Sequence, residues 1–176
     1  FEKEDCIINK LPGDAIIISV KNVAIGVQTA DCAPKLFYEP RKKIIGCIHS
    51  GWKGALKGVV RNTIKKLVEL DCNISEMVFS IGPCIGRKSY EVGLDLYAKF
   101  INENKKNHIF FEKKNDKYFF DLRKFVNNEL LNLSVKKIDN LEMDTFSKSE
   151  FFFSHRRSIM NKEEDYGRCI SVILMT

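Results

Sequence analysis

Short runs of β-branched and aromatic residues alternate with segments of helical periodicity along this chain. The runs are bounded by Gly, Pro, Asn, Asp or charged residues, which is typical of strands. The predicted strands span residues 14–19, 22–28, 35–38, 44–48, 76–81 and 169–175. Strands and helices in this mixed order predict an α/β or α+β fold, with mixed β-sheet layers flanked by helices.

Apolar residues recur at intervals of three and four in other segments, which predicts amphipathic helices. The predicted helices span residues 53–70, 89–101 and 121–133. In the first, Lys57, Arg61 and Lys65 occupy the face opposite the apolar residues and predict an exposed basic row. Gly93 weakens the second helix, whereas Asp121 is a favourable N-cap for the third.

Composition limits the classes of protein that remain. The 176 residues suit a single domain, 1–176, and contain no run of eighteen apolar residues and no signal-peptide pattern. The formal charge is +6, but the lysines are spread among Asn, Ile and Glu without an RNA-binding aromatic pattern, which favours a solvated surface over nucleic-acid binding. The six cysteines lie mostly in apolar runs, which predicts reduced thiols in a cytoplasmic protein.

Candidate metal chemistry is concentrated between residues 28 and 58. Cys32 precedes one predicted strand and His49 ends the next, so a hairpin would bring both to the same end of the sheet. A thiolate and an imidazole suit zinc, and the adjacent Asp31 would orient the ligands. Cys47 is a further candidate ligand, although a cysteine at such a position more often belongs to the core.

Candidate anion-binding residues lie in two turns. Lys53 enters the first predicted helix, where it would hold phosphate as a point charge or would simply be an exposed lysine. Gly82 and Gly86 bracket a tight turn whose backbone amides would approach a ligand, unless it is a plain turn. Cys84 within this turn would be a nucleophile, but the local sequence supplies no base.

A third candidate anion site follows the aromatic residues 151–153, which predict a buried strand. Because neighbouring residues of a strand point to opposite faces, only one of Arg156 and Arg157 would face the site. We expect Arg156 to bind an anion and Arg157 to form a structural ion pair. Arg168 is a further candidate for phosphate binding or for a structural role.

Four segments, TADCAP, HSGWKG, GPCIG followed by SYEVG, and FFFSHRR, resemble in order the signature blocks of the laccase-domain family. This family, once described as multicopper polyphenol oxidases, is regarded as zinc-dependent purine nucleoside phosphorylases, and some members are called peptidoglycan editing factors. The resemblance implies phosphorolysis of adenosine, inosine, guanosine or methylthioadenosine, with adenosine deamination as a side activity. It also implies that Cys32 and His49 are catalytic metal ligands, and it favours a two-layered mixed sheet.

The chain departs from the family pattern at several positions. The family's third zinc ligand, a histidine in an upstream QVHG-type block, has no counterpart after Phe1, so we expect an upstream segment to be missing. His108 and His155 are weaker substitutes, because one lies in a polar stretch and the other beside two arginines. Lys53 stands where the family usually has Arg, and Asp144 precedes Thr145 where the family commonly has Cys.

Two other functional classes stay open. Cys32 as nucleophile and His49 as base would suit a cysteine-type amidohydrolase acting on peptidoglycan precursors. Alternatively, the departures from the family pattern would suit an inactive, metal-free interaction protein. The sequence does not specify the oligomeric state.

Overall fold

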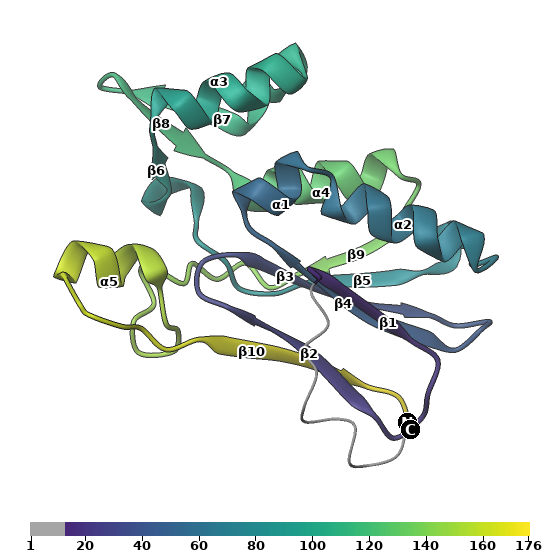
Figure 1. The fold of residues 1–176 in the computed structure, drawn as a ribbon. Helices are drawn as coiled ribbons and strands as arrows, with labels where there is room; N and C mark the ends of the chain where they lie inside the picture. Colours follow the sequence, from purple (N-terminus) through teal and green to yellow (C-terminus); the bar gives the residue numbers. More distant parts are fainter. Residues whose placement is uncertain (1–12) are drawn as a thin grey trace.

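The computed structural model describes residues 13–176, and Figure 1 shows a mixed sheet with helices over one face and a second, smaller sheet against the other. The main sheet has the order β1 (Ala15–Ile18), β4 (Ile44–Ser50), β3 (Ala33–Glu39), β5 (Val78–Ile81) and β9 (Lys137–Asn140). Only β5 and β9 pair in parallel, and the other neighbours are antiparallel. The smaller sheet pairs β2 (Ala24–Thr29) with β10 (Cys169–Leu174).

Helices α1 (Trp52–Leu56), α2 (Val59–Glu69) and α4 (Leu122–Asn132) cover the main sheet. A separate three-stranded sheet, β6 (Glu91–Val92), β8 (Lys117–Phe120) and β7 (Phe111–Lys114), packs with α3 (Leu94–Glu103) through aromatic rings. The last helix is α5 (His155–Asn161), and short 3₁₀ turns span Ile74–Glu76, Arg87–Ser89 and Lys105–Phe110. This arrangement confirms the predicted fold class.

The core lies between the main sheet and its helices. Alternate residues of β3 point toward α2, where Phe37 packs with buried residues such as Val60 and Leu67. The ring of Phe37 lies 5.1 Å from that of Phe79, centroid to centroid. A Cβ atom at Gly46 would come within 2.0 Å of Phe37 Cζ, so this strand position requires glycine. The predicted runs 35–38 and 44–48 are therefore confirmed as a paired hairpin, β3 and β4.

The structure corrects two predicted helices. The helix predicted over residues 53–70 is divided into α1 and α2 by Gly58, whose φ of 73° lies in the left-handed region that interrupts a right-handed helix. The helix predicted over residues 89–101 begins only at Leu94, with Gly93 as its N-cap, because Glu91 and Val92 pair with β8 instead.

The predicted strand over residues 151–153 is wrong. Phe151 and Phe153 are 65% and 52% exposed, and the chain turns there instead of pairing with a sheet. Ser154 then caps α5, whose residues include Arg156 and Arg157, so the strand rule used to separate these two arginines does not apply. Across residues 13–176, no helix has the length and apolar character needed to cross a membrane.

Candidate functional site

The hairpin brings Cys32 and His49 to one end of the main sheet. Cys32 immediately precedes β3, and the register pairs Ala33 with Ser50 and Pro34 with His49. A Cβ atom at Gly51 would lie only 2.8 Å from the Cys32 sulfur, so the glycine after β4 allows the thiol to approach this strand end. The predicted meeting of the two residues follows from the local antiparallel pairing.

Asp14 orients the His49 imidazole. The Asp14 carboxylate lies 3.0 Å from His49 Nδ1, and the His49 amide donates to the Asp14 carbonyl at 2.7 Å. This contact directs Nδ1 toward the carboxylate and leaves Nε2 available, as in many carboxylate–histidine–metal arrangements. Sequence reasoning missed Asp14, because its position depends on the pairing of β1 with the distant β4.

Asp31 connects the cysteine turn to the C-terminal part of the chain. Its buried carboxylate accepts hydrogen bonds from Thr145 Oγ1 at 2.6 Å, Ser154 Oγ at 2.9 Å and the Arg156 amide at 2.7 Å. These donors belong to α5 and to the segment before it. The part that Asp31 holds in place is therefore α5, and its predicted role in orienting metal ligands stays a prediction.

The two arginines of α5 have different surroundings. The Arg157 guanidinium donates to the backbone carbonyls of Thr145, Phe146 and Phe152. The structural ion pair predicted for Arg157 is therefore wrong. Backbone carbonyl oxygens before α5, and not a carboxylate, accept its hydrogen bonds. The Arg156 guanidinium carbon lies 5.6 Å from the centre of the Tyr90 ring, a cation–π distance.

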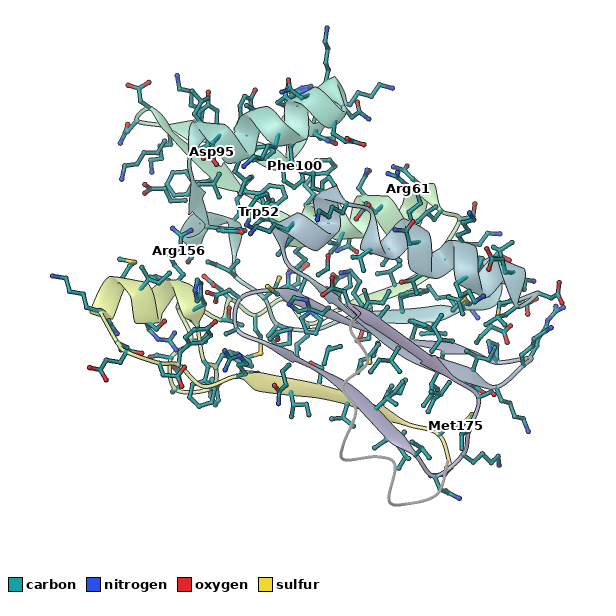
Figure 2. The ribbon with its side chains drawn as sticks, viewed as in Figure 1. Trp52, Arg61, Asp95, Phe100, Arg156 and Met175 are labelled. Atoms are coloured by element: carbon teal, nitrogen blue, oxygen red, sulfur yellow. The ribbon has the colours of Figure 1, made fainter. Side chains whose placement is uncertain are left out.

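A cavity of about 500 Å³ lies between the cysteine turn, the start of α1 and α5. Figure 2 shows Trp52 at the start of α1 and Arg156 at the start of α5. The lining of the cavity includes Cys32, Trp52, Tyr90, His155, Arg156 and Tyr166. The volume is in the usual range for small-molecule sites, and the lining combines aromatic rings with a cation.

Lys53 lies outside this cavity. It lines a second hollow of about 460 Å³ together with Asp14 and Lys57, and its ammonium lies 5.6 Å from the centre of the Trp52 ring. Lys53 and Arg156, both predicted to bind an anion, therefore line different hollows. The Arg168 guanidinium packs over the Tyr166 ring at 4.7 Å.

The backbone amides of the turn between Gly82 and Gly86 donate hydrogen bonds to other segments of the protein. The Gly82 amide donates to the Pro34 carbonyl at 2.9 Å, and the Gly86 amide donates to the Asp144 carboxylate at 2.9 Å. The Ile85 amide donates to the Asp31 carbonyl at 3.0 Å. These contacts do not support ligand binding by the amides, and instead they fix the turn behind the cavity.

The described residues include two candidate zinc ligands, Cys32 and His49. Burial, together with the Asp31 charge, raises the pKa of the Cys32 thiol to about 11. Across residues 13–176, no group of three His, Cys, Asp or Glu side chains could hold a metal ion. His108 contacts the Lys105 carbonyl, and His155 packs against Tyr166. Cys32 and His49 fit zinc chemically, and a three-ligand zinc site would need its third ligand from outside residues 13–176.

A family model described as multi-copper polyphenol oxidoreductase laccase matches residues 2–176. The chain belongs to this laccase family. The resemblance carried by the four sequence blocks is thereby confirmed. The family blocks surround the cavity in space: the ADC turn, the start of α1, the turn before α3 and α5 all contribute to its lining.

Relatives of this laccase family member carry the name purine nucleoside phosphorylase. One from Rickettsia conorii is 34% identical over 98% of this chain and 72% of its own length, and one from Haemophilus influenzae is 32% identical over 93% and 65%. The crystal structure of Bacillus licheniformis YfiH superposes with a TM-score of 0.84 at 26% identity, covering 93% of this chain and 61% of that one. A Neisseria meningitidis protein of family DUF152 gives 0.84 at 27% identity, covering 98% and 69%.

Proposed function

We propose that this protein cleaves purine nucleosides with inorganic phosphate, releasing the free base and ribose 1-phosphate. The observation that carries the proposal is the cavity in which Cys32, aromatic rings and the Arg156 cation meet. The names of the relatives agree with this activity. Adenosine, inosine, guanosine and methylthioadenosine are the proposed substrates, with adenosine deamination as a side activity.

Phosphorolysis of a purine nucleoside requires the cavity to bind an aromatic base and an anion at the same time. A purine base stacks well on aromatic side chains, which Trp52 and Tyr90 would offer. Arg156 would bind the phosphate and place one of its oxygens against C1′ of the ribose. That oxygen forms the new bond as the bond from C1′ to the base nitrogen breaks, and the base leaves with the electron pair and takes up a proton.

We further propose that Cys32 and His49 hold zinc, with a third ligand from outside residues 13–176. Bound zinc would act as a Lewis acid on a substrate oxygen or on water. The Asp14 carboxylate would keep the proton of the imidazole at Nδ1 and so present the Nε2 lone pair.

A cysteine-type amidohydrolase is less well supported by the same geometry. A nucleophilic cysteine needs a lowered thiol pKa, and burial raises that of Cys32 to about 11, which a bound cation would offset but a metal-free site would not. His49 is held by Asp14 as a metal-binding histidine would be, although such a contact also suits a base. An inactive interaction protein would show neither zinc nor product formation, so the experiments below separate the three classes.

Base release should depend on added phosphate. With inosine or adenosine, the purified protein is expected to produce base and ribose 1-phosphate in phosphate buffer, and at least tenfold less base in a phosphate-free buffer. Chromatographic measurement of base, ribose and ribose 1-phosphate tests this. Equal rates in both buffers with free ribose as product would overturn phosphorolysis in favour of hydrolysis.

Substitutions at Arg156 and Lys53 should show which hollow binds phosphate. Arg156→Ala is expected to raise the phosphate KM about tenfold or more, because a charged donor to the anion is lost, and to leave the nucleoside KM within about twofold. Lys53→Ala should have a smaller effect, and Lys53→Arg should retain phosphate use. Lys65→Ala, an exposed lysine of α2, serves as the control. A larger effect at Lys53 than at Arg156 would place the anion in the second hollow.

A further inference from the structure

Lys35 is a fully buried lysine in the centre of the main sheet. It is 0% exposed, lies on β3, and pairs in register with Ile48 on one side and Ile81 on the other. Its side chain lies on the same face as Phe37, between the sheet and the helices. Lysine is almost never fully buried without a partner, so this position requires an explanation.

The Lys35 ammonium is directed toward the cysteine turn. Its one hydrogen bond within residues 13–176 is to the Ala33 carbonyl oxygen, at 3.4 Å. Ala33 directly follows Cys32, which lines the cavity. The ammonium therefore lies behind the cavity floor, and its other N–H groups have no acceptor among the described residues.

The carboxylate that faces Lys35 compensates this charge only in part. Glu129 comes from α4, and its Oε2 atom has no hydrogen-bond partner within the described residues. Burial lowers the pKa of Lys35 to about 8, which leaves the ammonium mostly charged at pH 7. Burial raises the pKa of Glu129 to about 7, against the opposing charges of Lys35 and Arg61, which leaves a fraction of this carboxylate neutral. No hydrogen bond or ion pair joins Lys35 to Glu129 within the described residues, so this carboxylate does not neutralise the ammonium by direct contact.

The Asp31 carboxylate, which also lines the cavity, keeps its negative charge, but its oxygens are turned to donors of the C-terminal segment. Both carboxylate oxygens of Asp31 accept hydrogen bonds from the C-terminal segment. Arg156 supplies a cation on the opposite side of the cavity, at α5. An anion in the cavity would thus lie between the half-buried Arg156 guanidinium and the fully buried Lys35 ammonium, where partial exclusion of water strengthens the action of both charges.

We propose that the buried Lys35 ammonium gives the cavity floor a positive potential and thereby raises its affinity for inorganic phosphate. The inference rests on the proposed function in taking phosphate as the anion. Lys35 does not touch the ligand and acts through the floor formed by the cysteine turn. Burial of an incompletely paired charge lowers the stability of the fold, and the same charge raises the affinity for the anionic substrate.

The test measures phosphate binding directly, by titration calorimetry on the purified protein. Lys35→Met preserves side-chain length and removes the charge, and it is expected to weaken phosphate affinity about tenfold. Glu129→Gln removes the opposing charge and should retain or strengthen phosphate binding. The double variant Lys35→Met/Glu129→Gln leaves no unpaired carboxylate and should bind phosphate as weakly as Lys35→Met, which keeps the test valid if the single variant folds poorly.

Two further measurements separate this role from a purely structural one. The nucleoside KM should change by less than about twofold in Lys35→Met, and the melting temperature of the double variant should stay equal or rise because both buried charges are lost. Unchanged phosphate affinity in a folded Lys35→Met or double variant would overturn the inference. Phosphate binding that depends on Lys35 in a protein that forms no ribose 1-phosphate would instead contradict the proposed function and leave this inference standing.

Discussion

Replacing Cys32 or His49 with alanine is expected to remove bound zinc and to lower nucleoside cleavage by about a thousandfold or more. Wild-type protein that includes the segment supplying the third ligand should carry about one zinc per chain, and either variant should carry almost none, because the loss of one of three ligands leaves too few to retain the metal. The hairpin pairing of β3 and β4 keeps the two positions together, so the substitutions should change the site more than the fold. Elemental analysis and steady-state kinetics on the same samples measure both effects.

Two further substitutions test whether the loss of zinc and activity is specific to the metal site. Asp14→Asn removes the charge beside His49 Nδ1 and should lower zinc affinity about 10- to 100-fold, which is less than the effect of either ligand substitution. His108→Ala changes an exposed histidine outside the site and should leave zinc and activity unchanged. Equal zinc content in wild type, Cys32→Ala and His49→Ala would exclude this metal site. Loss of activity at Cys32 without zinc in any sample would favour the amidohydrolase instead.

The Asp31→Asn variant is expected to lose about 3 kcal/mol of unfolding free energy. The buried carboxylate accepts from Thr145, Ser154 and the Arg156 amide. An amide has one acceptor oxygen, so its NH₂ group would face donors and leave buried groups unsatisfied. Asp31 has a φ of 79°, a conformation that asparagine tolerates, so the loss should come from the hydrogen bonds and not from backbone strain.

Urea unfolding measures this loss, and Asp116→Asn provides a matched control. Asp116 also has a left-handed backbone, with a φ of 59°, but its side chain is 95% exposed. We expect the control to change stability by less than about 0.5 kcal/mol. Similar stabilities of Asp31→Asn and the control would show that the carboxylate does not hold α5 in place.

The parts of the fold predicted from sequence are those set by local patterns. Tight pairing of neighbouring strands follows from alternation and turn residues, so the β3–β4 hairpin and the meeting of Cys32 with His49 were predictable. The short β6 and the charged β7 have no such pattern and were missed. Gly58 could have indicated the division between α1 and α2. The apolar periodicity continues across this glycine, however, and predicted one continuous helix.

The rest of the candidate site depends on contacts between distant segments. Asp14 reaches His49 only because β1 pairs with β4, and no spacing in the sequence indicates that pairing. The aromatic residues before Ser154 suggested a strand, whereas Ser154 itself is an N-cap residue that could have indicated α5. Nothing in the sequence distinguishes Lys35 from a surface lysine, because its burial results from α4 packing over the sheet.

The hydrogen bonds of Asp31 also set an order of events during synthesis. All strands of the main sheet lie before residue 141, whereas the side chains that bond to Asp31 begin at Thr145, 114 residues further along the chain than Asp31. On the ribosome, the sheet and its helices can therefore pack before α5, which carries Arg156, has emerged. Until residues 145–156 have been synthesised, Asp31 lacks these three donors, and we expect the cavity to be open on the side that α5 later covers.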